Sequence, residues 1–261
     1  MRRSYRFDGP AGEPFEPTAA GGGPLLVVCA LGVERWALRG GDWTAPGMPA
    51  RGAGRALLAA TGMGPVRARR SVTALLSGGG SGYGALLATG FCAAAGPGIR
   101  PGDAVVAAEV RDEGQTSIGV PSCGLLADAL RARGLTVHLG RIHSADRVVR
   151  GAAARRRLHD DGALGIDMET AAVLDAARRA APGLPGAAVR IVVDTPEQEL
   201  LRPGTVPSGV RAWRALRSAV PAFTAWHHAL APQSGATDPT DPTDPSHPTE
   251  TPIRTLPQEA S

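Results

Sequence analysis

The chain has 261 residues, of which 43% are hydrophobic and 20% charged, which is ordinary for a packed, water-soluble protein. Its 28 basic residues, all arginine, give a net charge of only +4, and aromatic residues make up 4%. Nucleic-acid binding is therefore not expected, since it needs a basic stripe with aromatic platforms. The longest apolar runs, such as residues 24–33, are too short to cross a bilayer, so we expect no stable membrane insertion and a cytoplasmic location.

Composition divides the chain into three parts. Residues 1–23 are rich in Pro, Gly and acidic residues without hydrophobic periodicity, which is typical of a flexible N-terminal arm. Residues 232–261 contain the repeat TDPTDPTDP and are predicted to form a disordered tail rich in Thr, Asp and Pro. The segment between them, residues 24–231, is predicted to fold as a single domain.

Within this domain, short apolar runs alternate with amphipathic stretches. The runs predict strands at 25–31, 56–61, 85–89, 104–110, 135–142, 163–168 and 187–193. The amphipathic stretches predict helices at 65–76, 123–133, 145–158, 170–181 and 208–231. Several strands are apolar at consecutive positions, as expected of strands covered on both faces. The alternation predicts an α/β fold, a three-layer αβα sandwich around a mixed, largely parallel central sheet, with ligands bound at the carboxyl ends of the strands.

Two groups of residues receive a structural interpretation. Cys29, Cys92 and Cys123 are odd in number and form neither a CxxC pair nor a zinc-binding spacing. We therefore expect small buried hydrophobic residues, with no disulfide scaffold and no metal site. The arginines at 155–157 lie on a predicted helix beside acidic residues and are predicted to form a solvated face.

An acid and a glycine turn follow the first two strands. Glu34 would lie in the first turn of the helix after the first strand, where the helix dipole favours a carboxylate. Taken alone, it is also explained as an ordinary helix-start acid. The second strand runs into TGMG at 61–64, a turn that lets backbone N–H groups, including that of Gly62, approach an anion or a sugar. Turns of this kind are also common in α/β units that bind nothing there.

The third strand ends in a stretch of mostly small residues, ATGFCAAAG at 88–96. This stretch, around Gly90, would leave room for a flat ring against the backbone. The preceding GGGSGYG at 78–84 matches a dinucleotide-binding motif in letters only, because it leads into a strand and not from a strand into a helix. No dinucleotide cofactor is therefore expected.

Two later strands end in carboxylates. Glu169 follows the sixth predicted strand and Asp194 follows the seventh. Taken separately, Glu169 is also explained as a helix-start charge and Asp194 as a turn former before Pro196. Together with Glu34, they are three acids at strand ends able to line one crevice, an arrangement typical of a catalytic site.

Seven motifs in their order resemble the nucleoside phosphorylase superfamily, particularly the methylthioadenosine/S-adenosylhomocysteine nucleosidases, from Leu25 to about Trp226. The motifs are ALGVE at 30–34, TGMG at 61–64, TGF at 89–91, RPGDAVV at 100–106, GRIHSAD at 140–146, DMETAA at 167–172 and RIVVD at 190–194. Within the superfamily, the segments ATGFCAAAGPGIRPGD, GIDMETAA and AVRIVVDTP are most similar to the hopanoid-associated phosphorylases. Those proteins are read as adenosylhopane nucleosidases, which release adenine and leave ribosylhopane.

The resemblance implies roles for individual residues. Glu34 corresponds to the acid that activates the attacking water, and Asp194 to the acid that protonates N7 of the departing purine. Glu169 corresponds to the carboxylate that hydrogen-bonds the ribose hydroxyls, with Met168 packing against the sugar. The other residues that it assigns to substrate binding are Gly62, Gly90, Phe91, Cys92, Ser144 and Arg190.

Two positions depart from the family. Val193 stands where nucleosidases often have Ser before the catalytic Asp, which affects how Asp194 is oriented. Phe91 stands where a Ser or another small residue is usual, which alters the base pocket. The resemblance implies no cofactor and no metal. It implies a homodimer acting on a small purine nucleoside, which is lipid-linked where the substrate is adenosylhopane.

Two other functions compete with hydrolysis. A phosphorylase would use inorganic phosphate as co-substrate, with Gly32, Arg67 and Arg190 as candidate donors to it. Glu34 argues against this reaction, because a carboxylate beside the phosphate would repel it. A protein that binds nucleosides without turning them over would not require all three acids.

Overall fold

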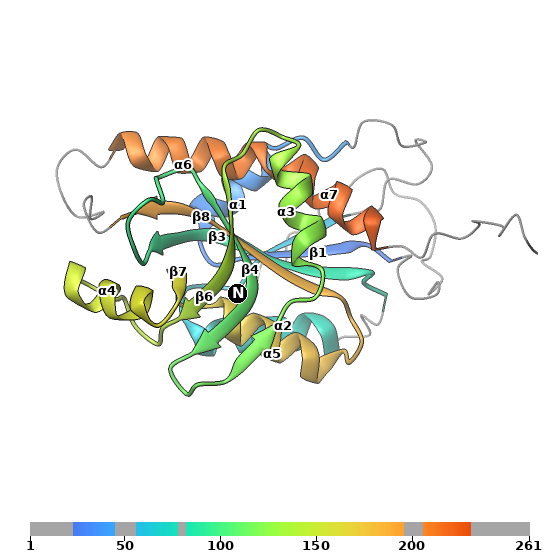
Figure 1. Cartoon of the computed structure of the whole chain (residues 1–261). Helices are drawn as coiled ribbons and strands as arrows, with labels where there is room; N and C mark the ends of the chain where they lie inside the picture. The colour runs from blue at the N-terminus through green and yellow to red at the C-terminus, as the bar shows by residue number, and fades with distance from the viewer. Residues whose placement is uncertain (1–22, 45–55, 78–81, 196–205, 231–261) are drawn as a thin grey trace, which may run out of the picture. The chain divides into compact units, whose positions relative to one another are not determined.

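The structure, a computed structural model, describes four stretches of the chain, which are residues 23–44, 56–77, 82–195 and 206–230. Nearly all of the predicted arm, 1–23, and the whole predicted tail, 232–261, lie outside them. The described stretches all belong to one unit of packed helices and strands (Figure 1).

One mixed sheet runs through the described residues. Its strands are β1 (Leu25–Cys29), β2 (Ala56–Ala60), β3 (Ala85–Ala94), β4 (Ala104–Asp112), β5 (Ser117–Gly119), β6 (Val137–Ser144), β7 (Ala163–Asp167) and β8 (Gly186–Asp194). The order is β2-β1-β3-β7-β6-β4-β5, and β8 pairs with both β3 and β4. Five of these strand pairings are parallel and three are antiparallel. The predicted mixed, largely parallel sheet is confirmed.

The longest strand, β3, closes part of this sheet into a ring. Its first residues pair with β1 and β8, but its register against β8 shifts between Cys92 and Ala93. Beyond this irregularity, which bends a strand, Ala93 and Ala94 pair with β7. The pairings β3–β8–β4–β6–β7–β3 therefore form a closed circuit. The prediction that this strand ends at residue 89 was wrong, and its extra length draws the ends of β3, β7 and β8 together.

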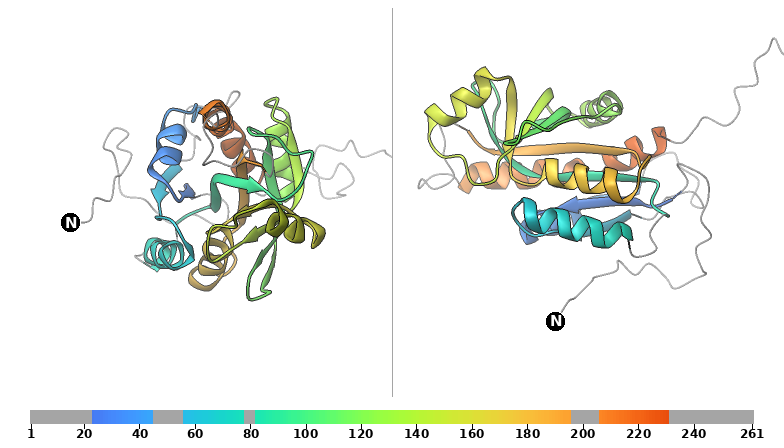
Figure 2. Two further views of the ribbon diagram at one scale, coloured as in Figure 1. Left: turned by 90° about the vertical axis from the view of Figure 1, so that its left-hand side faces the viewer. Right: turned by 90° about the horizontal axis from the view of Figure 1, so that it is seen from below.

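Helices cover the sheet on both faces (Figures 1 and 2). They are α1 (Gly32–Arg39), α2 (Pro65–Ser77), α3 (Cys123–Arg131), α4 (Ala152–Asp160), α5 (Thr170–Ala180), α6 (Val206–Ser218) and α7 (Val220–Ala229). On one face α1 packs against α6 and α3 against α7, and on the other α2 packs against α5. The short helix α4 lies beside β7. This arrangement confirms the three-layer αβα sandwich.

The core forms where the strands are apolar at consecutive positions. All five residues of β1, LLVVC, are buried, and so are the first six of β3. Such strands need helices on both faces, because neither row of side chains tolerates water. From the helical layers, Phe223 and Trp226 of α7 insert into this core with no exposed surface.

Two predicted helices differ from the structure, and one short strand was not predicted. The predicted helix 145–158 begins later because Gly151, with φ of 82°, sets the start of α4. The predicted helix 208–231 is two helices, and Pro221, which lacks a backbone N–H, lies in the first turn of α7. The strand β5 was missed, because three residues with only Ile118 buried are too short to show a period.

The burial of two cysteines agrees with the sequence analysis. Cys29, Cys92 and Cys123 are free, and the first two are buried, as expected of small hydrophobic residues. Burial raises the pKa of the Cys29 thiol to about 12, and the nearby Glu34 carboxylate adds to this shift. No helix in the described part of the chain is long and apolar enough to cross a membrane.

Candidate active site

Glu34 lies in the first turn of α1, immediately after β1, and only 2% of it is exposed. Its Oε2 accepts hydrogen bonds from the backbone N–H groups of Ala30 (2.9 Å) and Leu31 (2.7 Å). Its Oε1 accepts one from the N–H of Phe91 in β3 (2.7 Å). The first two bonds are those of a helix-start acid, but the third joins the carboxylate to a neighbouring strand. Three backbone donors therefore fix this buried carboxylate in one place.

Gly90 makes this approach to β3 possible. Its φ of 138° disfavours any side chain, and a Cβ at this position would lie 2.6 Å from Oε1 of Glu34 and 2.7 Å from Nη1 of Arg190. The glycine therefore lets a carboxylate and a guanidinium reach the same stretch of backbone. Gly90 belongs to the site because of the space it leaves.

Arg190, in β8, is 1% exposed and uses all three guanidinium nitrogens inside the protein. Nη2 pairs with Asp167 Oδ2 at 2.6 Å, Nε donates to Thr170 Oγ1 at 2.9 Å, and Nη1 donates to the Thr89 carbonyl at 2.9 Å. Burial by itself lowers the pKa of Arg190, but the carboxylates around it, Asp167 first among them, outweigh burial and raise the pKa. The guanidinium is thus a fixed buried charge at the centre of the site.

Asp167 connects Arg190 to the end of β6. Its Oδ1 accepts a hydrogen bond from the Ser144 hydroxyl (2.5 Å), whose oxygen accepts one from the Ala171 N–H (3.0 Å). Its Oδ2 accepts from both the N–H and the hydroxyl of Thr170. The sequence interpretation missed Asp167 and Thr170, although both belong to the DMET stretch. The available signal was Asp167 itself, an acid that ends an apolar strand.

Glu169 comes two residues later, as the N-cap residue of α5, and is 6% exposed. Its Oε1 accepts a hydrogen bond from the Gly64 N–H (2.7 Å), so the glycine turn after β2 donates to the protein's own carboxylate. Burial raises the pKa of Glu169, against the opposing effect of Arg190. The N–H of Gly62 donates to the Ala30 carbonyl (3.1 Å), which ties this turn to the one that holds Glu34. Met168, between Asp167 and Glu169, is half-buried.

Asp194, the last residue of β8, pairs in register with Ala93 of β3. Its Oδ2 accepts a 2.7 Å bond from Nη2 of Arg155, a residue of α4 that is 3% exposed. The prediction that this arginine belongs to a solvated face was wrong. Arg155 lies three residues before Leu158, which packs in a small apolar cluster, and that helical spacing was the signal for an inward-facing position.

The strand β3 brings these groups together. Phe91 binds Glu34 through its N–H, Gly90 leaves space for Arg190, and Ala93 lies opposite Asp194. Cys92, between them, is buried, and burial strongly raises the pKa of its thiol, which stays neutral. The described residues contain no group of His, Cys, Asp and Glu side chains placed to hold a metal ion. The site offers four carboxylates and two buried arginines, a composition suited to general acid and base chemistry.

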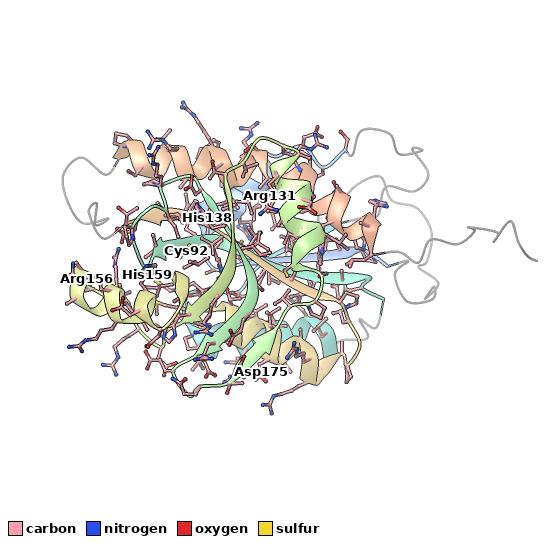
Figure 3. All side chains as sticks on the ribbon, viewed as in Figure 1. Cys92, Arg131, His138, Arg156, His159 and Asp175 are labelled. Atoms are coloured by element: carbon pink, nitrogen blue, oxygen red, sulfur yellow. The ribbon has the colours of Figure 1, made fainter. Side chains whose placement is uncertain are left out.

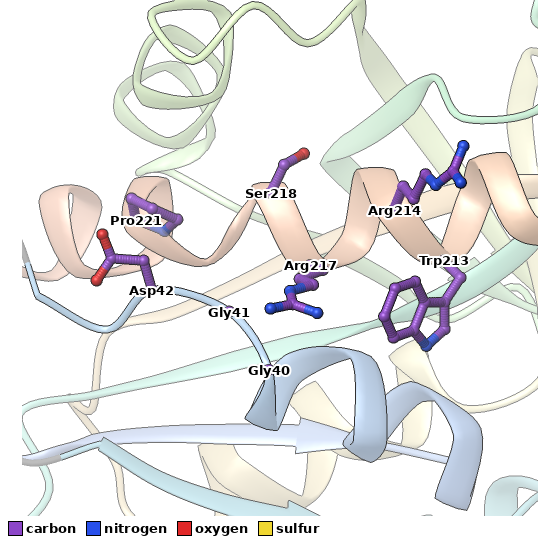
Figure 4. Close-up of a pocket in the computed structure, with 8 residues that line it drawn as sticks. All are labelled: Gly40, Gly41, Asp42, Trp213, Arg214, Arg217, Ser218 and Pro221. Atoms are coloured by element: carbon purple, nitrogen blue, oxygen red, sulfur yellow. The ribbon is translucent and has the colours of Figure 1, made fainter.

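A groove of about 490 Å³ lies elsewhere in the described residues (Figure 4). It runs between the turn after α1 and the helices α6 and α7. Its lining residues are Gly40, Gly41, Asp42, Trp213, Arg214, Arg217, Ser218 and Pro221. This set shares no member with the predicted site, whose residues gather at the strand ends.

Solved structures with the same fold include three hydrolases. The 5'-methylthioadenosine/S-adenosylhomocysteine nucleosidase of Neisseria meningitidis, solved with methylthio-immucillin-A, is 20% identical, with a TM-score of 0.62 over 77% of this chain and 97% of that one. The S-adenosylhomocysteine nucleosidase of Streptococcus pyogenes, solved with 5-methylthiotubericidin, is 18% identical, with a TM-score of 0.64 over 82% and 99%. The futalosine hydrolase of Helicobacter pylori is 15% identical, with a TM-score of 0.62 over 78% and 97%.

Sequence comparison gives a family but no individual relative. No curated protein matches the chain significantly. The model of one family, described as the phosphorylase superfamily, matches residues 47–211, which is more than half of the chain and includes every site element except β1 and α1. The fold, the matched residues and the expectation from the seven motifs agree, and the chain belongs to the phosphorylase superfamily.

Proposed function

We propose that the protein is a purine nucleosidase that hydrolyses the N-ribosidic bond of a 5'-substituted adenosine. The substrate we propose is adenosylhopane, which would give ribosylhopane and adenine in bacterial hopanoid biosynthesis. The reaction would need no cofactor, and we propose that the enzyme works as a cytoplasmic homodimer. The solved nucleosidases and the futalosine hydrolase with this fold support an N-ribosyl hydrolase in general terms.

One observation carries the choice of water over phosphate, namely the three backbone N–H groups that bind the Glu34 carboxylate. Converging backbone donors at the end of a strand are what a bound phosphate uses. Here an internal anion already occupies them, and it would repel a second anion. Arg190, the buried cation considered for phosphate, is engaged by Asp167, Thr89 and Thr170.

The proposed reaction assigns one step to each carboxylate. Glu34 takes a proton from the water that attacks the anomeric carbon. The electrons of the breaking N-ribosidic bond move onto the purine, and Asp194 supplies a proton to N7 of this leaving group. Glu169 binds the ribose hydroxyls and stabilises the positive charge that develops on the sugar. General acid catalysis of this kind typically contributes about 10²–10⁴-fold.

The surroundings of Glu34 support an apolar 5' substituent. Exposed apolar side chains follow the ends of β1 and β2. After β1, on α1, Val33 is 48% exposed and Trp36 is 67% exposed. After β2, Met63 is 52% exposed and Val66 is 75% exposed. Soluble proteins rarely gather exposed large apolar residues without a use for them. Exposed apolar residues next in sequence to the turns that hold Glu34 and Glu169 suit a lipid-like group better than a polar one.

The test is a product assay on adenosines with 5' substituents of increasing size, from methylthioadenosine to adenosylhopane, with and without inorganic phosphate. We expect free adenine and free ribosyl product in both buffers, with the highest kcat/KM for the largest apolar substituent. The variant Glu34→Gln should be inactive, and Asp128→Asn, which changes an exposed carboxylate on α3, should match the wild type.

Three results would contradict the proposal in different ways. Adenine release that depends on phosphate, with ribose 1-phosphate as the product, would make the protein a phosphorylase. A preference for methylthioadenosine would make it a nucleosidase of small thio-nucleosides. A substrate bound and recovered intact would leave a binding protein. A monomer in light scattering would contradict the homodimer alone.

A further inference from the structure

The orientation of Asp194 depends on a residue outside the family motifs. The position before it is Val193, whose side chain has no group to hydrogen-bond a carboxylate. In its place Arg155 of α4 binds Oδ2 of Asp194 at 2.7 Å, across 39 residues of sequence. This contact places one oxygen of the carboxylate, while Oδ1 is buried and has no partner among the described residues.

The guanidinium of Arg155 makes this contact and no other hydrogen bond among the described residues. Its Nη2 binds Asp194, whereas its buried Nε and Nη1 find no partner in the described part of the chain. A buried guanidinium with two unsatisfied donors is unfavourable, and a pair of apolar residues in place of a whole buried ion pair is often at least as stable. Its neighbour Arg156, by contrast, is exposed on the same helix (Figure 3). The placement of Arg155 is thus poorly explained by stability and well explained by the carboxylate it holds.

We propose that Arg155 is the positioning residue for the general acid, and this inference rests on the function proposed above. By holding Oδ2, Arg155 leaves Oδ1 as the oxygen that carries the proton. When the N-ribosidic bond breaks, that proton passes from Oδ1 to N7 of the purine. Asp194 becomes a carboxylate, and the positive charge of Arg155 stabilises it at that moment. The base then leaves as a neutral purine.

Other ionisable groups near Asp194 do not replace this cation. Cys92, which precedes the Ala93 opposite Asp194 in β3, stays a neutral thiol because burial raises its pKa. Arg190, four residues earlier in β8, is paired with Asp167 of β7. Among the described residues, Arg155 is therefore the cation that contacts Asp194.

The experiment compares Arg155→Met, Arg155→Lys and the control Arg156→Met, with kcat and KM for adenine release measured for each. For Arg155→Met we expect kcat to fall by about 10²-fold with little change in KM, because the acid loses its orientation and its charge stabilisation. Arg155→Lys should restore part of kcat, and Arg156→Met should behave as the wild type.

A second comparison keeps the inference testable if Arg155→Met folds poorly. In an Asp194→Asn background, Arg155→Lys should reduce the residual activity no further, because both changes act on one group. Wild-type kcat in a folded Arg155→Met enzyme would overturn the inference, and so would additive losses in the double variant. Absence of base release by the wild-type enzyme would instead overturn the proposed function.

Discussion

The two carboxylates proposed to act on the substrate are held in opposite ways. Glu34 is fixed by three backbone N–H groups, two of them from its own turn and one from β3. Asp194 is held by one side chain, Arg155, which comes from a separate helix, and one of its oxygens has no partner among the described residues. Glu34, the proposed general base, is thus held by backbone groups, and Asp194, the proposed general acid, is held by a single ion pair.

This difference teaches where the site tolerates change. Backbone donors persist whatever side chains surround them, so the position of Glu34 follows from the fold. The position of Asp194 depends on Arg155 and on the packing of α4 against β7. We therefore expect removal of the Glu34 carboxylate to cost more activity than removal of the Asp194 carboxylate, and smaller changes around either residue to cost less.

The largest effect is expected for Glu34→Gln. All three bonds to Glu34 are made by N–H donors, so the amide nitrogen of Gln must face one of them. The variant loses the base and also the fixed position, and we expect kcat to fall by about 10⁴-fold. Measurement of kcat with thermal unfolding as the fold check tests this. Retention of more than a tenth of wild-type kcat in a folded variant would contradict the role of Glu34.

Asp194→Asn should have a smaller effect, of about 10²–10³-fold on kcat. An amide still accepts the bond from Arg155 through its oxygen, so position is kept while the transferable proton is lost. Single-turnover kinetics should place the loss in the chemical step, not in binding. A change confined to KM would show that Asp194 only binds the base.

Gly90→Ala tests the surroundings of Glu34 without replacing a charged residue. The added Cβ would lie 2.6 Å from Oε1 of Glu34, so the carboxylate must shift. We expect about 1–3 kcal/mol of destabilisation and about a tenfold loss of kcat, since small misplacements are costly for catalysis. The matched control is Gly98→Ala, which has φ of 85° but no atom within 4 Å of the new Cβ. Equal losses of activity in both variants would point to backbone strain alone.

The smallest effect is expected for the pH dependence of stability at Glu169. Burial raises its pKa in the folded state, so ionisation there opposes folding, and this destabilisation grows as pH rises through the raised pKa. Glu169→Gln removes the charge and keeps an acceptor for Gly64. The Tm of the variant minus that of the wild type should be larger at pH 7 than at pH 4. A difference that does not vary with pH would contradict it, and Glu113→Gln, which is exposed, should show none.

How far the sequence predicts the site depends on how local each contact is. Glu34 and Glu169 were found because each stands where an apolar strand passes into a helix. Asp167 was missed for two reasons. Glu169, two residues later, is also an acid at the end of the same apolar strand, and the partners of Asp167, Ser144 and Arg190, come from other strands. Arg155 was assigned to solvent, because a run of three arginines reads as surface unless the helical face is known.

The sequence by itself determined the strand–helix alternation, the buried strands and the three acids at strand ends, because these follow from hydrophobic period and residue type within short windows. Only the tertiary structure decided the ring of strands closed by β3, the pairing of Arg155 with Asp194 and the burial of Arg190 beside Asp167. These contacts join residues far apart in sequence. They depend on strand register and on the bend at Cys92 and Ala93, which no local pattern encodes.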